Sequence, residues 1–317
     1  MTQSVMTNAR AAFDIARDAA DLWLSRNAFQ HAGALGFYTL FSMAPMLIIL
    51  TTIVGAVYGE QAASGELTGQ ITNLLGAQAA EAVTEAMRRS RTEEAGLLPT
   101  ILGVGALLFG ATTVFAQMQT SLNAFWGVRA KPSRSGILKF MRSRLVSLSL
   151  VIILGFLLLV SFAATVALSA ILEYANEQVP IPAIVVSAFD IVTSLGIATL
   201  LFATIFKVLP DVDLQWSDTW RGAFFTAVLF VIGQYLISWY LTKAAPGSPY
   251  GAAGALVVIL LWVYYSALIL FIGAALTRAW IRHNGRFIEP TDTAVKVKME
   301  ILEEDERGEM EHVKSVE

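Results

Sequence analysis

Cysteine is absent from this 317-residue chain, and charged residues make up only 15% of it. Without cysteine the chain has no disulfide, no thiolate metal ligand and no cysteine nucleophile. Soluble domains carry roughly 25% charged residues, whereas this chain is 56% hydrophobic with a mean hydropathy of +0.61. These values indicate an integral membrane protein. The net charge of −3 argues against a nucleic-acid-binding protein held by a basic surface.

The N-terminal segment, residues 1–32, lacks an apolar core and contains three aspartates, so it is not a signal peptide. Phe13, Ala16, Ala20 and Trp23 recur at helical spacing and predict an amphipathic helix over residues 8–30. Two placements stay open. The helix lies on the membrane surface, or it packs on the membrane bundle.

Long apolar segments dominate the remainder of the chain. A bilayer span needs about 20 apolar residues. Six segments reach that length, roughly residues 33–57, 98–121, 145–171, 182–208, 219–242 and 251–277. The fold class expected is therefore all-α, a polytopic membrane protein with six transmembrane helices. The membrane domain covers residues 33–285, and residues 286–317 form a charged cytoplasmic tail that we interpret as disordered or loosely helical.

The distribution of basic residues sets the expected orientation. With the N-terminus cytoplasmic, 18 of the 22 Lys and Arg residues lie inside and 4 lie outside. This asymmetry predicts that both termini lie in the cytoplasm. The long outside connection, residues 58–96, carries an apolar stripe that predicts one or two amphipathic helices between the first two spans. They form a lid over the bundle or are passive interfacial helices.

Polar residues within the spans are candidates for a substrate path, because each needs a partner or a wet cavity at bilayer depth. Pro45 predicts a kink in the first span, which also carries Tyr38 and Ser42. The kink is an ordinary bend, or it opens a cavity. Gln117 and the polar residues that follow it, as far as Asn123, lie near the cytoplasmic end of the second span. We place them at about the depth of Tyr38 and Ser42. Their position at the membrane interface alone explains them, or they line a substrate path.

Asp190 is the one carboxylate clearly within a predicted span, and Gln234 lies at a similar depth in the next span. Gln234 is therefore a candidate donor to Asp190. Lys207 is 17 residues further along the same helix as Asp190, about 25 Å away, which is too far for an ion pair. Asp190 is functional or simply a hydrogen-bonded structural residue.

Tyr264 and Tyr265 are adjacent near the middle of the sixth span. Adjacent positions on a helix differ by about 100° in direction, so at least one phenol points into the bundle. Small and polar residues near them define a face suited to close helix contact, namely Trp262, Ser266, Gly273 and Thr277. The inward tyrosine bonds a neighbouring helix or lines a substrate path.

The connection after the second span is basic and contains no acidic residue. Orientation alone explains it, and contact with anionic phospholipid headgroups is the alternative. The six cations in question are Arg129, Lys131, Arg134, Lys139, Arg142 and Arg144.

Enzymatic chemistry has little support in these residues. The three histidines, His31, His283 and His312, are isolated in sequence, and we interpret them as lying near the surface. Nuclease chemistry needs metal-binding carboxylates or a histidine acid–base pair in a wet site. An intramembrane protease needs a second aspartate besides Asp190, or a serine with a histidine at membrane depth. We therefore expect no enzyme, no catalytic residue, no metal and no cofactor.

Four stretches in order along the chain carry a family resemblance. They are ALGFYTLFSMAPMLIIL (34–50), FGATTVFAQMQTSLNAFWGV (109–128), LPDVDLQWSDTWRGA (209–223) and YGAAGALVVILLWVYYSALILFIGA (250–274). Together they resemble the YihY/virulence factor BrkB family of membrane proteins, formerly labelled ribonuclease BN. The resemblance implies a six-span bacterial inner-membrane protein and loose links to envelope function and transport.

The chain departs from the family pattern at three positions in its last two spans. Family members commonly carry a lysine where this chain has Gln234, a glutamine at Leu268 and a glutamate at Ala275. A mechanism that needs a proton-carrying carboxylate at position 275 is therefore in doubt. Two functions remain: a transporter or flippase-like permease for a solute or lipid, and an envelope scaffold. The bilayer is the expected partner, without nucleic acid, and a homo-oligomer stays open.

Overall fold

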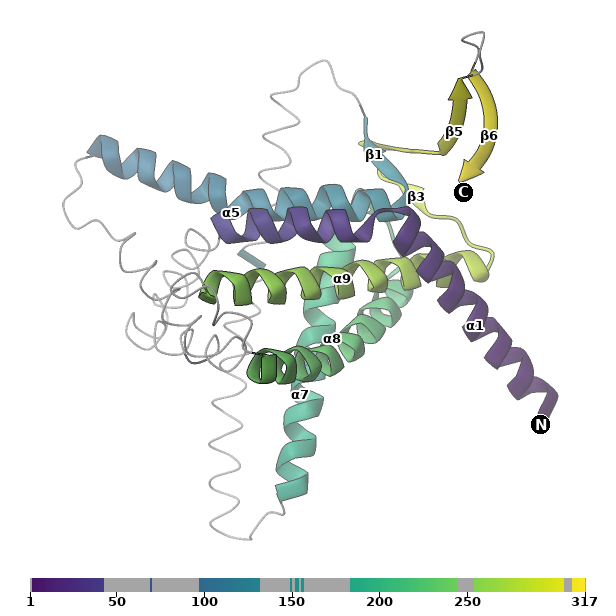
Figure 1. Cartoon of the computed structure of the whole chain (residues 1–317), viewed down its shortest axis with the longest axis horizontal. Coiled ribbons are helices and arrows are strands. Elements are labelled where there is room, and N and C mark those ends of the chain that lie inside the picture. The colour runs from purple at the N-terminus through teal and green to yellow at the C-terminus, as the bar shows by residue number, and fades with distance from the viewer. Residues whose placement is uncertain are drawn as a thin grey trace.

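The structure, a computed structural model, describes residues 2–42, 97–131, 183–244, 254–304 and 310–316, with residues 69, 149, 152, 153, 155 and 156. Helices dominate these ranges (Figure 1). They are α1 (Thr2–Ser25), a helix over residues 28–42, α5 (Leu97–Trp126), α7 (Ala183–Val208), α8 (Trp216–Ala244) and α9 (Gly254–His283). The predicted helical membrane fold is confirmed at this level.

Three of the described helices contain a stretch long and apolar enough to cross a bilayer: Ile191–Val208, Trp216–Ile237 and Leu256–His283. They overlap the fourth, fifth and sixth predicted spans, and the last continues six residues beyond the predicted end at 277. The 28–42 helix overlaps the first predicted span, and α5 overlaps the second. The third predicted span lies outside the described residues, apart from isolated positions. The predicted amphipathic helices of residues 58–96 also lie outside them, apart from residue 69. The count of six spans stays a prediction.

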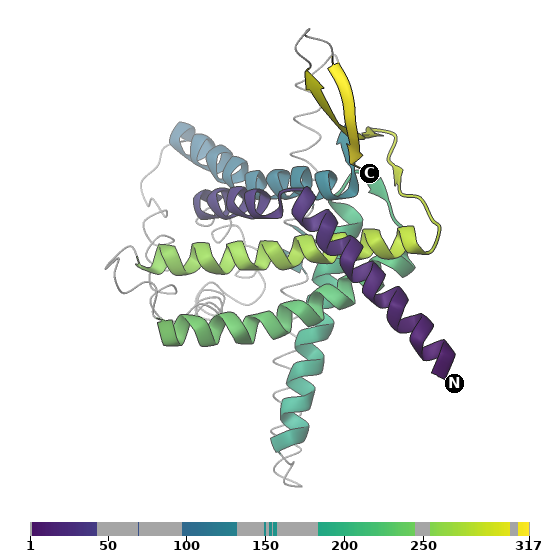
Figure 2. The same cartoon turned by 45° about the vertical axis from the view of Figure 1, so that its right-hand side comes forward.

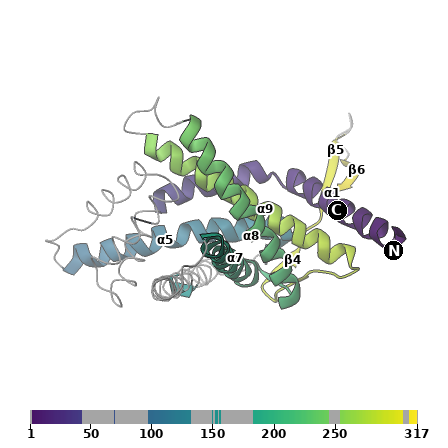
Figure 3. The same cartoon turned by 90° about the horizontal axis from the view of Figure 1, so that it is seen from below.

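The described helices do not all run in one direction. The 28–42 helix, α5 and α9 lie side by side in two views (Figures 1 and 2). Helix α7 crosses them steeply and is seen almost end-on from below (Figure 3). The packing is continuous nevertheless, because α8 contacts both α7 and α9.

Helix α1 packs on α9, with the Trp23 indole Nε1 donating to the Leu268 carbonyl at 3.3 Å. Its buried face carries Ile15 and Ala19, whereas the side chain of Phe13 is 68% exposed. The apolar face predicted for this helix, which included Phe13, was therefore wrong. The face that is buried is shifted by roughly one residue along the sequence. Helix α1 ends because Asn27 adopts a positive φ of 53°, a left-handed conformation that asparagine tolerates. The chain then continues as the 28–42 helix in a new direction (Figure 1).

Short antiparallel strands follow or connect the helices. Strand β1 (Val128–Ala130) pairs with β4 (Ala294–Lys296), and β2 (Val212–Asp213) pairs with β3 (Glu289–Pro290). Strand β5 (Met299–Glu304) pairs with β6 (Met310–Val316). The prediction of a disordered or loosely helical tail was therefore wrong. Residues after Pro290 form backbone ladders instead, which a reading of charge alone does not reveal.

The β1–β4 and β2–β3 pairings bring residues 119–131, 205–221 and 277–296 together, and the His31–Ser121 contact adds residues 23–31. We call this end of the molecule the basal end. The four segments counted as cytoplasmic from their basic residues all contribute to it. Their meeting at one end is what that topology requires. Which side of the membrane this end faces stays a prediction.

Candidate functional site

The basal end contains a polar contact between the 28–42 helix and α5. His31 Nδ1 and Ser121 Oγ lie 3.0 Å apart, and Gln117 Nε2 donates to the same Ser121 oxygen at 3.4 Å. The predicted depth match with Tyr38 and Ser42 was wrong. Ser121 meets His31, which lies about 16 Å along the helix axis from Ser42. The polar end of α5 therefore contacts the start of the first helix rather than its middle.

The ring of His31 packs against two aromatic side chains. Phe125 of α5 and Phe271 of α9 stack with centroids 4.9 Å apart, and the His31 ring meets each edge-on at 6.0 and 6.1 Å. Burial lowers the pKa of His31, because the charged imidazolium loses hydration there. The prediction that His31 is isolated near the surface was wrong. It joins three helices.

A second polar contact joins α5 to the loop after α7. Asn123 Nδ2 donates to Asp211 Oδ2 at 2.8 Å, and the Asp211 backbone N–H donates to Asn123 Oδ1 at 2.8 Å. Thr291 N–H donates to the Asp211 carbonyl at 3.1 Å. This reciprocal pair holds the loop in position. The LPDVD sequence around Asp211 did not indicate that Asn123 is its partner.

The start of α8 is fixed by a buried ion pair. Arg286 Nη2 lies 2.6 Å from Asp218 Oδ1, with the two side chains 35% and 3% exposed respectively. Arg286 Nη1 also donates to Gln215 Oε1 at 2.8 Å. Asp218 lies in the first turn of α8, where a carboxylate also interacts favourably with the helix dipole. The segment after α9 is thereby attached to α8.

Helices α8 and α9 approach closely through glycine–threonine pairs. A Cβ added to Gly222 would lie 2.8 Å from Thr277 Cγ2, and one added to Gly273 would lie 2.7 Å from Thr226 Cγ2. Both threonine hydroxyls donate within their own helix, Thr226 to Gly222 and Thr277 to Gly273, each at 2.7 Å. The predicted contact face is thus occupied by α8 at Gly273 and Thr277.

Tyr265 lies on the same seam. A Cβ added to Gly233 of α8 would lie 2.8 Å from Tyr265 Cε1, and the phenol oxygen is closer still. Tyr264 packs against the hydrophobic core and is partly buried. One of the paired tyrosines therefore fills the space that a glycine leaves on the neighbouring helix. A role in a substrate path stays a prediction for both.

The other predicted path residues are not gathered into one cavity by the described contacts. Tyr38 is 37% exposed and packs edge-on against Phe37 at 5.8 Å, whereas Ser42 is buried. Gln234 is half-buried on α8. Pro45 and the side chain of Asp190 lie outside the described residues and side chains, so the Pro45 kink and the Asp190–Gln234 pair stay predictions.

Of the six cations proposed for lipid contact, two are described. Arg129 is exposed on β1, and Lys131 Nζ donates to the Asp292 carbonyl at 2.8 Å. Arg134, Lys139, Arg142 and Arg144 lie outside the described residues. The lipid-contact prediction for this connection is therefore still untested.

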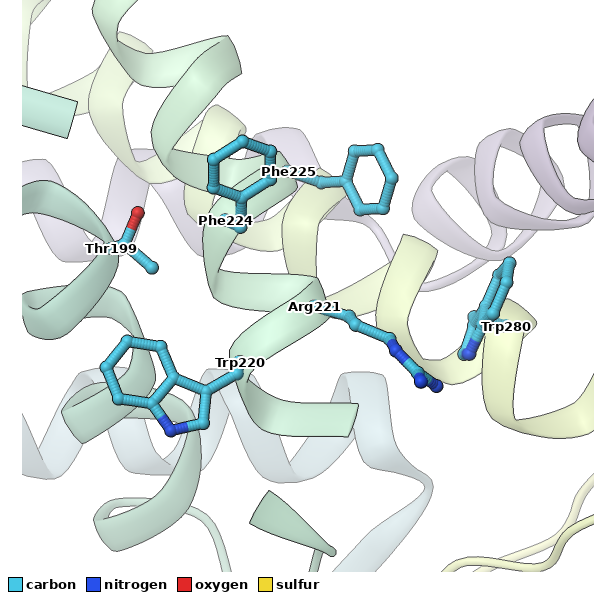
Figure 4. Close-up of a pocket in the computed structure, with 6 residues that line it drawn as sticks. All are labelled: Thr199, Trp220, Arg221, Phe224, Phe225 and Trp280. Carbon is cyan, nitrogen blue, oxygen red and sulfur yellow. The ribbon is translucent and has the colours of Figure 1, made fainter. Parts of the chain in front are cut away.

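A hollow that the sequence reasoning missed lies where α7, α8 and α9 meet, toward the basal end (Figure 4). It has a volume of about 640 Å³ and is open to the surface. Aromatic rings form most of its walls, and one guanidinium is present. The lining residues are Thr199, Trp220, Arg221, Phe224, Phe225 and Trp280.

Two hydrogen-bond donors lie at one side of this hollow. Figure 4 shows the Arg221 side chain reaching toward Trp280, and its Cζ lies 5.9 Å from that ring centroid. The Trp280 indole nitrogen is buried and has no hydrogen-bond partner among the described residues. Tryptophans and cations alternate near the predicted span ends, and such residues mark membrane interfaces. This pattern was the sequence signal that could have indicated the hollow.

Long apolar helices with exposed aromatic faces define a membrane protein of the α-helical class. The chain belongs to a family described as "Virulence factor BrkB", which matches residues 20–295. The resemblance drawn from the four sequence stretches is thereby confirmed. No solved structure matches the chain.

Curated relatives agree with this membership. A UPF0761 membrane protein of Acinetobacter baylyi is 27% identical over 280 residues, covering 86% of this chain and 63% of the relative. One of Pseudomonas paraeruginosa is 27% identical, covering 86% and 65%. One of Haemophilus influenzae is 24% identical, covering 78% and 87%. The chain thus spans less than two thirds of the length of the first two relatives.

Proposed function

We propose that this protein is a flippase-like permease whose substrate is an anionic phospholipid or a similar amphiphile. The observation that carries this proposal is the hollow between α7, α8 and α9. It combines exposed aromatic walls with the Arg221 guanidinium and the buried Trp280 N–H. Apolar walls suit acyl chains, and convergent donors suit phosphate oxygens.

The position of the hollow along α8 supports a lipid over a soluble solute. Trp220 lies at the hollow, and Trp239, which is 65% exposed, lies 19 residues further along α8. That spacing corresponds to about 29 Å of helix, close to the hydrocarbon thickness of a bilayer. Tryptophans favour both membrane interfaces. Arg221 therefore lies at headgroup level, with Phe224 and Phe225 one turn deeper.

Arg221 suits the headgroup role for chemical reasons. The guanidinium is planar and always charged, and it binds phosphate through two parallel N–H donors. Its position over the Trp280 ring stabilises the cation without using its donors. The phosphate of a lipid supplies acceptors to the exposed Arg221 guanidinium, which the Trp280 ring holds in place.

A non-transport envelope scaffold is the second candidate, and the α8–α9 seam favours it. Tyr265 and the threonines on this seam pack against glycines, which is a way to lock helices together. On this view the polar residues only hold the helices in register. The two candidates differ in whether purified protein moves lipid.

Transbilayer movement of a fluorescent phosphatidylglycerol in proteoliposomes tests the proposal. Dithionite bleaches only the outer leaflet, so protein-dependent loss of the protected signal reports movement. We expect movement with the wild type, at least a tenfold slower rate with Arg221→Gln, and no change with Arg17→Gln. Arg17 lies in a 72% exposed pair with Asp21 and serves as the matched control. Absence of movement by well-folded wild type would refute the permease and favour the scaffold.

A further inference from the structure

The segment after α9 carries the most exposed large apolar side chain in the part of the chain that the structure describes. Phe287 is 86% exposed, and Val295 and Val297 are 38% and 37% exposed. A single exposed apolar residue is ordinary on a protein surface, whereas exposed apolar groups gathered in one place mark an interaction site. The surroundings of these three side chains decide between the two cases.

The β1–β4 ladder places Val295 and Val297 on one face. Val295 lies directly opposite Arg129 in the register, and residues directly opposite in a sheet share a face. The Val297 N–H donates to the Gly127 carbonyl at 2.8 Å, which continues the pairing past β4. The other face of the ladder carries Val128, which is buried in the core. Arg129, Val295 and Val297 therefore form the outward face of the ladder.

Phe287 lies at the edge of this ladder. Lys296 Nζ of β4 is 5.9 Å from the centroid of the Phe287 ring, so a cation and an exposed aromatic ring are held together. A lysine can lay its aliphatic stem along an apolar surface while its ammonium stays in a polar layer. We call the set of Arg129, Phe287, Val295, Lys296 and Val297 the anchor surface.

The anchor surface is attached where the apolar stretches of the helices end. The apolar stretch of α8 begins at Trp216, and that of α9 ends four residues before Phe287. Arg286, the residue before Phe287, donates to Gln215 Oε1 at 2.8 Å and pairs with Asp218 at 2.6 Å. Since Gln215 and Asp218 flank Trp216, these contacts hold Phe287 at the level of the membrane boundary.

The charge around the anchor surface is positive. Residues 127–131 and 282–298 together contain six Lys or Arg residues and two acidic ones. One of the six, Arg286, is compensated by Asp218. A positive juxtamembrane surface is attracted to anionic lipid headgroups. The charge alone would fit an acidic protein as well, but the exposed Phe287 at the membrane boundary favours the bilayer.

We propose that the anchor surface binds the membrane leaflet on the basal side of the protein through anionic lipids. Phe287 and the two valines enter the boundary between headgroups and acyl chains, and Arg129 and Lys296 contact lipid phosphates. This contact attaches the segment after α9 to the leaflet. The members of the anchor surface are distinct from the residues that line the hollow at Arg221, so the proposal holds whether or not the hollow binds lipid.

A spin label at position 287 of the full-length protein tests this contact. The chain contains no cysteine, so Phe287→Cys carries a single label. The exposed Asp292, in the same segment, gives Asp292→Cys as the control label. Power saturation in proteoliposomes compares collisions with oxygen, which concentrates in the bilayer, and with a water-soluble nickel chelate. With phosphatidylglycerol present, we expect an oxygen-to-nickel ratio at least threefold higher at position 287 than at position 292. In phosphatidylcholine alone the excess should be smaller.

Charge substitutions on the Phe287→Cys background test the role of the cations. Arg129→Gln with Lys296→Gln should at least halve the excess in phosphatidylglycerol vesicles. Arg10→Gln with Arg17→Gln removes the same charge from exposed positions of α1 and should leave the excess unchanged. All the substituted side chains are exposed, so each variant should keep the wild-type Tm, which is measured first.

Three results would overturn the proposal. The first is a label at position 287 that stays accessible to nickel in both kinds of vesicle. The second is a label shielded from both oxygen and nickel, which would indicate burial against another protein or a second copy of this chain. The third is an oxygen-to-nickel ratio that ignores phosphatidylglycerol and the Arg129 and Lys296 substitutions alike.

Discussion

The contact between α8 and α9 makes Gly222→Ala a sharp test of the fold. The added methyl would lie 2.8 Å from Thr277 Cγ2 and 2.9 Å from Thr277 Cβ, and the hydroxyl oxygen is closer still. Thr277 is 2% exposed and its hydroxyl is bonded to the Gly273 carbonyl, so it has little freedom to rotate away. The two helices must therefore move apart.

Overpacking of this kind costs about 1–3 kcal/mol. Replacing glycine by alanine also changes helix propensity by up to about 1 kcal/mol in the opposite direction. Gly196→Ala on α7 carries the same propensity change but meets nothing within 4 Å. The propensity change cancels in the difference between the two variants, which therefore isolates the contact, and we expect Gly222→Ala to be less stable than Gly196→Ala by about 1–3 kcal/mol.

Detergent titration in mixed micelles gives the free energy of unfolding of each variant, and the two values are compared. The double variant Gly222→Ala/Thr277→Ala should recover part of the loss, because it removes the methyl and hydroxyl that the new Cβ meets. Equal stability of Gly222→Ala and Gly196→Ala would refute the α8–α9 seam, and with it the packed position of Tyr265.

Three further predictions concern the basal end. Asp218→Asn should lower the free energy of unfolding by about 1–3 kcal/mol, because it breaks a largely buried ion pair, whereas Asp21→Asn in an exposed pair should change it by less than about 0.5 kcal/mol. Asn123→Ala should cost about 1–3 kcal/mol, because it removes the donor to Asp211 Oδ2 and the acceptor of the Asp211 N–H, and an unchanged value would remove the proposed clamp. Burial lowers the pKa of His31, so the unfolded chain binds that proton more tightly. The His31 contribution is complete above the unfolded pKa of about 6.5 and is lost as the pH falls toward the lower folded pKa. Wild type should lose stability between pH 7 and pH 5, and His31→Gln should lack that component of the loss.

Sequence periodicity predicted the apolar helices because bilayer burial imposes long uninterrupted runs. The end of α7 at Val208 agrees with the prediction, since the LPDVD sequence follows it, whereas α9 continues six residues beyond the predicted end at 277. The packing face with Gly273 and Thr277 was predicted for a similar reason, because small residues at helical spacing indicate close contact.

The basal end was beyond sequence reasoning because its contacts join residues far apart in the chain. Asn123 and Asp211 are 88 residues apart, and His31 and Ser121 are 90 apart. The local sequence around each of these residues does not identify its partner. The β1–β4 and β2–β3 ladders likewise depend on backbone pairing between distant segments. The sequence therefore indicated only that the tail is charged, and not that part of it forms strands.

The hollow was missed for a different reason. Lysine and arginine near span ends already have an explanation in membrane orientation. Only the three-dimensional arrangement shows that Arg26 is buried and that Arg221 reaches toward Trp280.

Tryptophan quenching by brominated lipids tests the lipid hollow most directly. Trp220 lines the hollow, whereas Trp239 lies at the other end of α8. Brominated phosphatidylglycerol should quench the wild type more strongly than brominated phosphatidylcholine. That excess should decrease in Trp220→Phe, because Trp280 also lines the hollow. It should vanish in Arg221→Gln and persist in Trp239→Phe. Equal quenching by both lipids in the wild type would contradict an anionic lipid bound at Arg221.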